Sequence, residues 1–340
     1  MLQDIVIKSN ILPDFMIRYA IRVLLKGTLR KQESITKEKT YSIDNYLNIL
    51  SKSQIAIDTD EANEQHYEVP ISFFTKVLGP YLKYSCGLWG STNDKLESSE
   101  KNMLELYIQR AQISNGQRIL DMGCGWGSLS LFLAKRFPDC SIVCISNSKT
   151  QKEYIDKEIN KFELTNLECI TQDINKFKTE KKFDRIISIE MFEHIRNYVE
   201  IFSRIENMLS EKGLLFIHIF AHRKYAYYFD KYSESSWMAR TFFSGGTMPS
   251  ENLLPKAATN FELKNHWIVS GLHYQKTLEA WLKEMDNQKE IITNIFKATY
   301  GYEYKKMFIY WRIFFMACAE TFGYNNGNEW RINHYLFQKK

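Results

Sequence analysis

The sequence predicts an α/β fold built on a doubly wound, largely parallel sheet. From about residue 106 onward, short apolar runs typical of buried strands alternate with amphipathic segments of helical period. A glycine-rich turn follows the first of these runs, as in open sheets that bind a ligand at the carboxyl ends of their strands. Before residue 106 the alternation is missing and the pattern is mostly helical, so the sheet belongs to the later part of the chain.

This pattern divides the 340 residues at about residue 105. Residues 1–105 are expected to form an N-terminal helical cap that also covers the substrate and the cofactor. Residues 106–340 are expected to form the sheet domain, with helical insertions near residues 222–258 and 275–326. No linker-like segment separates these insertions from the sheet, so we expect them to sit on it.

The first predicted helix covers residues 14–32, where apolar and basic residues alternate at helical spacing. A basic amphipathic helix either lies on an anionic membrane surface or packs on the protein with its basic face in water. Packing is the favoured interpretation, and peripheral lipid contact is kept as the alternative.

The sheet is predicted from seven apolar runs in the later part of the chain. Five are expected as parallel strands and two as closing strands, in order 117–122, 140–146, 167–174, 183–194, 213–220, 261–270 and 329–340. Helices are expected between them at 128–137, 149–162, 198–213, 278–296 and 308–322.

Composition and charge exclude several classes of protein. Hydrophobic residues make up 44% and charged residues 25%, which is ordinary for a globular protein and excludes a disordered or fibrous chain. The 45 basic and 40 acidic residues leave a net charge of +5, too weak a bias to favour a nucleic-acid partner. No apolar run approaches the roughly 18 residues of a membrane span, and the first residues lack the apolar core of a signal peptide. We therefore expect a cytoplasmic protein without stable membrane insertion.

The six cysteines are scattered along the sequence, without paired C-x-x-C units. They lie at positions 86, 124, 140, 144, 169 and 318. This spacing predicts neither a metal site nor a disulfide framework, which favours a reducing, intracellular setting.

The glycine-rich turn lies in the segment ILDMGCGWG, residues 119–127. Gly123 and Gly125 permit positive φ and let a ligand approach the backbone closely. The dinucleotide fingerprint G-x-G-x-x-G does not fit, because the third glycine falls one place early, at Gly127, and no acid follows the second strand. Asp121, just before the turn, suits a cationic or amino-bearing ligand better than a pyrophosphate. A tight turn without a ligand is the less favoured alternative.

Eight short motifs occur in a characteristic order from about His66 to the C-terminus. They are HYEVPISFF (66–74), KYSCGLW (83–89), LDMGCGWGSL (120–129), ISNSKTQ (145–151), QD (172–173), ISIEMFEH (187–194), GLHYQKTLEAW (271–281) and AETFGYNNGNEW (319–330). Together they resemble the class I methyltransferases that use S-adenosylmethionine. Within that class they resemble the branch joining cyclopropane fatty-acid synthases to coclaurine-type N-methyltransferases, and only their joint order makes the resemblance specific.

The resemblance implies a Rossmann-like sheet that binds S-adenosylmethionine and releases S-adenosylhomocysteine. It implies contacts to the methionine end, the ribose and the adenine of this cofactor. The residues at the matching positions are Tyr84 and Ser85 for the methionine end, Asp121, Gly123 and Gly125 along the cofactor, Ser146 and Gln151 for the ribose, and Gln172 and Asp173 for the adenine. For Asp173 a plain surface acid is the alternative.

The acceptor site needs a base, because an amine must be bound neutral or lose its proton before it attacks a methyl group. Glu190 closes the fourth predicted strand, and Glu193 and His194 follow it at spacings of three and four residues, so a helical turn would bring all three to one side. Clustered carboxylates attract a cationic amine and raise each other's pKa. A capping acid pair with a hydrogen-bonded histidine is the alternative. Catalytic roles fall on the matching E-x-x-E-H set in coclaurine-type enzymes, so these three residues are predicted to be catalytic.

The rival reaction is cyclopropanation of an unsaturated acyl chain. In the resembled synthases a bicarbonate removes the proton, held by a cysteine, a glutamate, a histidine and a tyrosine. This chain has the matching Cys86, Glu193 and His218, but we expect the tyrosine's counterpart at residues 314–315, which carry no hydroxyl. Glu190 would also repel bicarbonate. These departures favour N-methylation.

The sequence thus predicts a methyltransferase that acts on the nitrogen of a small aromatic or alkaloid-like amine. Cys86, His218, Phe243 and Phe314 are expected to line the acceptor pocket, where aromatic rings would hold a planar cation. Core packing is the alternative for the aromatic residues. A cyclopropane fatty-acyl-phospholipid synthase and a non-catalytic cofactor-binding scaffold are the alternative functions, and a homodimer is compatible with either.

Overall fold

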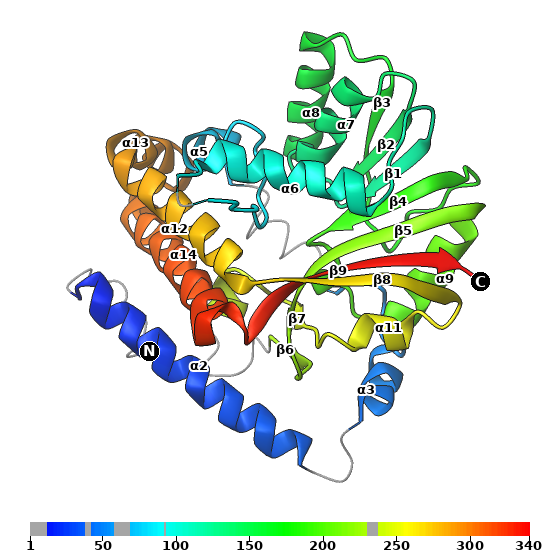
Figure 1. Cartoon of the computed structure of the whole chain (residues 1–340). Coiled ribbons are helices and arrows are strands. Elements are labelled where there is room, and N and C mark those ends of the chain that lie inside the picture. The colour runs from blue at the N-terminus through cyan, green and yellow to red at the C-terminus, as the bar shows by residue number, and fades with distance from the viewer. Residues whose placement is uncertain (1–11, 38–41, 58–68, 92, 230–236) are drawn as a thin grey trace.

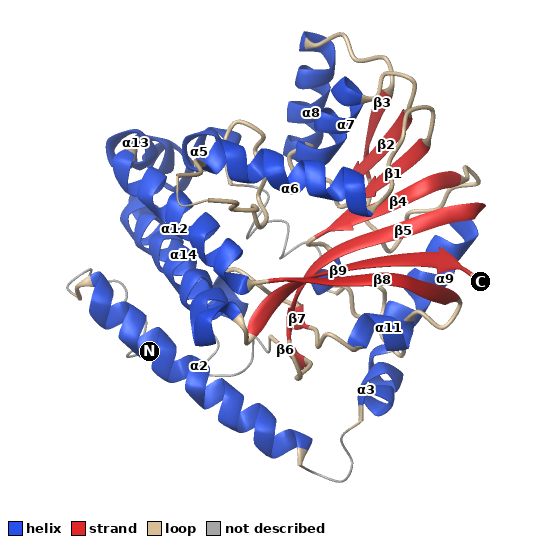
Figure 2. Ribbon diagram, in the orientation of Figure 1, coloured by secondary structure: helices blue, strands red, loops and turns tan. Residues whose placement is uncertain are grey.

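The computed structural model describes residues 12–37, 42–57, 69–91, 93–229 and 237–340. Its centre is one seven-stranded sheet with the strand order β3-β2-β1-β4-β5-β9-β8, seen as a single twisted sheet in Figure 2. The strands are β1 Arg118–Met122, β2 Ser141–Ser146, β3 Leu167–Thr171, β4 Phe183–Ile189, β5 Leu209–His222, β8 Phe261–Val269 and β9 Trp330–Lys339. The strands β1–β5 pair in parallel, and β9 and β8 pair antiparallel, which confirms the predicted fold class.

Both faces of the sheet are covered, so most residues of its central strands are buried. One face carries α6 Leu96–Arg110, α7 Ser128–Arg136 and α8 Lys149–Lys161. The other carries α3 Ile43–Leu50 and α9 Tyr198–Met208. The strand order reverses between β1 and β4, and such a reversal opens a crevice at the carboxyl ends of the strands.

A second helical layer stands beside the sheet (Figure 1). It consists of α12 Gly271–Asn287, α13 Lys289–Tyr300, α14 Tyr304–Gly327 and the short α5 Ile71–Val77. Large buried rings hold these helices together, and Trp311 of α14 packs 4.9 Å from Phe73 of α5. This layer places the N-terminal end of α12 at the carboxyl ends of the strands, where its Tyr274 contacts Glu190.

The first insertion range contains only short elements among the described residues. They are a two-stranded ribbon of β6 Tyr227–Tyr228 and β7 Thr247–Met248, and the helices α10 Trp237–Thr241 and α11 Leu253–Ala257. The expected domain boundary at residue 105 falls inside α6, whose Tyr107 is fully buried in the core beneath the sheet. The division into a cap and a sheet domain therefore stays a prediction.

The N-terminal helix α2, Asp14–Thr36, packs along the outside of α14, as the favoured interpretation expects. Arg18 donates to Glu279 at 2.6 and 2.8 Å and to Glu320 at 3.0 Å. Phe15 and Tyr19 on the same helix remain exposed. Within the described residues, every helix is too short or too polar to cross a bilayer. Contact of α2 with a lipid surface stays a prediction.

Candidate functional site

The glycine turn between β1 and α7 folds as its three glycines require. Gly123, Gly125 and Gly127 have φ angles of 80°, 54° and 76°, in the left-handed region that glycine adopts without strain. A Cβ on Gly123 would lie 2.6 Å from Met191, so the side chain is excluded there by packing. A Cβ on Gly125 would meet nothing within 4 Å. The backbone at Gly125 therefore faces open space.

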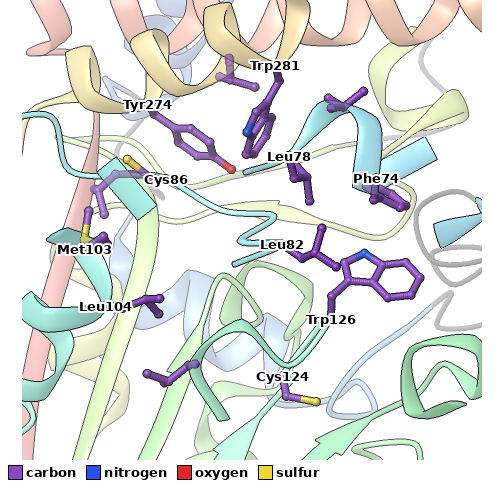
Figure 3. Packing of buried hydrophobic residues seen from close by; sticks show 14 of the residues in the cluster. Phe74, Leu78, Leu82, Cys86, Met103, Leu104, Cys124, Trp126, Tyr274 and Trp281 are labelled. Atoms are coloured by element: carbon purple, nitrogen blue, oxygen red, sulfur yellow. The ribbon is translucent and has the colours of Figure 1, made fainter. Parts of the chain in front are cut away.

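That space is a cleft that is partly open to solvent. Its lining includes six of the nine predicted cofactor residues: Tyr84, Ser85, Asp121, Gly123, Gly125 and Gln151. Figure 3 shows buried side chains near it, with Tyr274 and Trp281 of α12 on one side and Cys124 and Trp126 of the glycine turn on the other. The lining of the cleft itself comes from the glycine turn, from residues 82–85, from α6 and from the carboxyl end of β4.

Two buried polar groups in this cleft are placed by neighbouring hydroxyls. Asp121 accepts a hydrogen bond from Ser130 at 2.6 Å, and burial raises its pKa to about 7. Gln151 accepts from Ser146 at 2.6 Å, which leaves its Nε2 without a partner among the described residues. Ser146 thus orients Gln151, whose amide can donate to a ligand.

Gln172 and Asp173 follow the carboxyl end of β3 and are not in the lining of the cleft. Asp173 accepts from the backbone N–H of Asn175 at 2.8 Å, so its carboxylate shapes the turn after β3. Their contact with an adenine ring stays a prediction.

Glu190 stands at the carboxyl end of β4 with a φ of 49°, a conformation rare for a residue with a side chain. Its Oε1 accepts from the backbone N–H of Cys86 at 2.9 Å and lies 3.0 Å from Nε2 of His218. Its Oε2 accepts from the hydroxyl of Tyr274 at 2.5 Å. Both carboxylate oxygens are therefore occupied, so Glu190 is held in one position.

Tyr274 corrects an expectation about the missing hydroxyl. We expected the site to lack a tyrosine because residues 314–315 are phenylalanines. Phe314 instead packs in the helical layer, stacked on Phe242 at 4.5 Å. The hydroxyl beside Glu190 comes from α12, inside the motif GLHYQKTLEAW that the sequence displayed. The site therefore has a tyrosine hydroxyl, and residues 314–315 do not count against cyclopropanation.

Glu193 and His194 lie in a single 3₁₀ turn, Phe192–His194, directly after β4. Oε1 of the fully buried Glu193 accepts from the backbone N–H of Phe220 at 2.8 Å, whereas its Oε2 has no partner among the described residues. Burial and the nearby Glu190 carboxylate raise the pKa of Glu193 well above its usual value. Burial lowers the pKa of His194 to about 4, so its ring is neutral at pH 7.

Aromatic rings stand beside this turn. Phe243 lies 4.9 Å from the ring of His194, 5.8 Å from Phe220 and 4.8 Å from Phe229. All three phenylalanines are only half-buried, unlike the rings of the core. They form a wall with an accessible face next to the turn, which we call the Phe243 wall.

Cys86 and His218 meet at Glu190 rather than at this wall. Cys86 contributes its backbone N–H, and burial raises the pKa of its thiol well above the usual value. Burial likewise lowers the pKa of His218 well below its usual value, so the ring is neutral. Cys86 is therefore an inert thiol that contributes its backbone.

A buried chain of side chains, which the sequence analysis missed, leads away from Glu190. Nδ1 of His218 lies 2.9 Å from Nε2 of His334 on β9, and Nδ1 of His334 lies 2.7 Å from the guanidinium of Arg110. The Tyr107 hydroxyl also lies 2.9 Å from Nδ1 of His218. His334 is 116 residues from His218 in sequence and comes beside it only through the β5–β9 pairing.

Lys83 is a second missed residue, fully buried beneath the cleft. Its ammonium donates to the hydroxyl of Ser85 at 2.5 Å and to the carbonyl of Cys86 at 2.8 Å. Burial lowers the pKa of Lys83 to about 8, so it is charged at pH 7. It fixes the segment that carries Tyr84 and Ser85 into the cleft.

Comparison with known proteins identifies the family. Residues 55–332 match the family model of mycolic acid cyclopropane synthetases. The chain is 36% identical to (S)-coclaurine N-methyltransferase of Thalictrum flavum subsp. glaucum, over 98% of this chain and 94% of that protein. It is 28% identical to the cyclopropane-fatty-acyl-phospholipid synthase of Escherichia coli strain K12, over 84% of this chain and 69% of that protein.

The fold also matches a solved structure over almost its whole length. A coclaurine N-methyltransferase bound to N-methylheliamine and S-adenosylhomocysteine superposes with a TM-score of 0.93 at 34% identity, covering 98% of this chain and 97% of that one. The chain therefore belongs to the S-adenosylmethionine-dependent methyltransferase family that unites cyclopropane fatty-acid synthases with coclaurine-type N-methyltransferases.

Proposed function

We propose that this protein transfers a methyl group from S-adenosylmethionine to the nitrogen of a small aromatic, alkaloid-like amine. The observation that carries the proposal is a buried carboxylate, Glu193, whose Oε2 has no partner among the described residues and whose 3₁₀ turn also carries His194, in ring contact with the Phe243 wall. A base next to an aromatic surface suits a planar amine. The alkaloid N-methyltransferases that the chain resembles support the same chemistry.

The types of group that line the cleft suit the cofactor. The open backbone at Gly125 permits close approach, and Nε2 of Gln151, which has no partner in the described ranges, suits a ribose hydroxyl. Tyr84 and Ser85 would hold the methionine end, and Asp121 would meet its ammonium group. When bound, the cofactor supplies an electrophilic methyl on a sulfonium, and the protein needs only to position the acceptor and remove its proton.

Glu193 is the proposed base. An amine enters largely as an ammonium ion, which two nearby carboxylates attract, and it must lose a proton to become a nucleophile. The raised pKa of Glu193 brings its proton affinity closer to that needed near neutral pH. His194, with a pKa of about 4, is a weak base and serves better to orient the acceptor against Phe243.

Glu190 is the proposed positioning carboxylate, and Arg110 sets the direction of the hydrogen bonds that reach it. An arginine can only donate, so Nδ1 of His334 must accept and its Nε2 must carry the proton. That proton is donated to Nδ1 of His218, whose Nε2–H then donates to Glu190. With Cys86 N–H and the Tyr274 hydroxyl, Glu190 receives three donors.

These donors and the Lys83 ammonium counteract the effect of burial, which raises the pKa of Glu190. The negative charge of Glu190 in turn raises the pKa of Glu193. The hydrogen bonds that start at Arg110 therefore affect the proposed base, Glu193, only indirectly, through the position and charge of Glu190.

The test uses S-adenosylmethionine labelled in its methyl group and a panel of acceptors. We expect label on the nitrogen of bicyclic benzylic amines and much slower transfer to small aliphatic amines that cannot cover the Phe243 wall. A matched variant, Phe243→Leu, should raise KM for the aromatic amines with little effect on the affinity for the cofactor. Failure of every amine to accept label, with cofactor bound, would overturn the proposal.

Cyclopropane synthesis is kept as a second candidate because of Tyr274. The Tyr274 hydroxyl, the Cys86 N–H and His218 surround the carboxylate of Glu190. Several hydrogen-bond donors thus meet in one buried place. Vesicles of unsaturated phospholipid in the same assay separate the two reactions. Label in a cyclopropane ring of the acyl chains would replace N-methylation as the main activity.

A cytoplasmic location, a homodimer and lipid contact by α2 belong to the same proposal. All six cysteines are free thiols, in keeping with a reducing compartment. The exposed Phe15 and Tyr19 of α2 are the residues that would touch a lipid surface. Sedimentation of the protein with anionic vesicles, and its mass in solution, test these two points.

A further inference from the structure

Three cysteines that are scattered in sequence meet behind the glycine turn. Cys144 on β2 and Cys169 on β3 are direct partners in the parallel register, so their side chains lie on the same face of the sheet. Cys124 reaches them from the turn after β1. All three are buried, and their Sγ atoms lie within 4.8 Å of one another.

We propose that Cys124, Cys144 and Cys169 form a binding site for a thiophilic divalent cation of the Zn²⁺ type. Zinc binds thiolate sulfur at about 2.3 Å, which places two sulfur ligands about 3.8 Å apart. The three sulfurs therefore need to approach by at most about 1 Å, within the reach of side-chain rotation. Their three elements are anchored in the sheet, which pre-organises the site.

Charge near the cluster suits a divalent ion. Three thiolates around Zn²⁺ keep one negative charge, which must be compensated in a buried place. The ammonium of Lys152 donates to the carbonyl oxygen of Cys169 at 2.9 Å. A cation thus stands at the edge of the site, paired with Asp156 at 2.7 Å.

The cluster also has a route of entry. Cys124 is part of the lining of the cofactor cleft, so an ion can arrive from the cleft and leave one coordination position facing it.

A bound ion would also fix the glycine turn. Cys124 sits between Gly123 and Gly125, and its backbone N–H already donates to Ile145 of β2 at 2.9 Å. Tying its sulfur to β2 and β3 would hold the turn in one conformation. The site is independent of the methyl acceptor, so it stands or falls separately from the proposed function.

The experiment titrates reduced, metal-free protein with Zn²⁺ in competition with a chromophoric chelator, under anaerobic conditions. We expect one ion per chain, and with Cd²⁺ a thiolate-to-metal charge-transfer absorption. Cys144→Val and Cys169→Val should each weaken Zn²⁺ binding by about 100-fold, because each removes one of three ligands. Equal affinity in these variants, or no Zn²⁺ binding by the wild type, would overturn the proposal.

Cys140→Val is the matched control. Cys140 is buried immediately before β2 but lies outside the cluster, with its thiol directed at the carbonyl of Ser114 at 3.3 Å. This variant should bind Zn²⁺ as the wild type does. If a cluster variant fails to fold, alkylation of the wild type decides the question. Zn²⁺ should protect Cys124, Cys144 and Cys169 together and leave Cys318 unchanged, and the absence of protection would contradict the site.

Discussion

At the scale of single residues, Glu190 carries the clearest sign of function. A left-handed conformation costs a residue with a side chain about 1–2 kcal/mol, and here it is stabilised by three hydrogen-bond donors around the carboxylate. Glu193 differs from it in that one carboxylate oxygen has no partner within the part of the chain that the structure describes. In the proposed mechanism, Glu190 holds the site in place and Glu193 takes the proton of the acceptor.

Gly125 gives the first prediction, Gly125→Val. The added side chain would project into the cleft, where nothing now lies within 4 Å, and it should weaken binding of S-adenosylmethionine by at least about 100-fold. The positive φ should cost about 1–2 kcal/mol of stability. Gly116→Val is the control, because Gly116 has a φ of 82° and open space but lies outside the cleft. Calorimetry should find equal destabilisation and unchanged binding in the control; unchanged binding in Gly125→Val would mean that the turn does not hold the cofactor.

At the scale of elements, the hydrogen-bonded chain from α6 through β9 and β5 to β4 can be broken at its outer end. Arg110→Met removes the donor that fixes the tautomer of His334, so Glu190 loses its directed partner. We expect kcat to fall by about 10- to 100-fold with little change in the affinity for S-adenosylmethionine. Arg110→Lys should restore part of the rate, since lysine also only donates. A loss of cofactor affinity equal to the loss in kcat would show a merely structural role.

The histidines of this hydrogen-bonded network make the stability of the protein depend on pH. His218 and His334 have folded-state pKa values well below 6.5, so the unfolded chain binds more protons below that value. Their contribution is complete above pH about 6.5 and is lost as the pH falls. Buried carboxyls such as Asp121, with a raised pKa of about 7, act in the opposite sense. The free energy of unfolding in urea, measured for the wild type and for His334→Gln, isolates the contribution of the histidines. The wild type should be more stable than the variant at pH 7 and should lose this extra stability as the pH falls to 5.

A difference in unfolding free energy that stays constant with pH would contradict the neutrality of the two histidines.

The order of elements could be predicted from sequence because their signals are local. Glycines at positive φ, apolar runs and helical periods predicted β1, its turn and the two closing strands. The contacts of Tyr274 and His334 depend on the position of α12 and on the β5–β9 register, which no local pattern encodes. The meeting of three cysteines has the same origin. The contacts that could not be predicted are therefore those that depend on tertiary packing and strand pairing.

At the scale of the whole molecule, α2 is fastened to the helical layer by a few ionic contacts. Arg18→Met would leave the carboxylate of Glu320, only 8% exposed, without one of its two arginine partners. We expect a loss of about 1–2 kcal/mol, or a fall in Tm of about 1–3 °C. Lys26→Met, an exposed position on the same helix, is the charge-matched control and should leave Tm unchanged. Equal Tm values for both variants would show that α2 is not anchored by Arg18.

The most direct test of the account is the rate of methyl transfer to the best aromatic amine, measured against pH with both substrates saturating. For the wild type we predict a rate that rises with pH and levels off at a pH well above 4.5, the usual pKa of a glutamate. Glu193→Gln should be slower by about 100-fold or more and lose this dependence, while its affinity for S-adenosylmethionine stays within about twofold. A variant with the rate and pH profile of the wild type would contradict the assignment of Glu193 as the base.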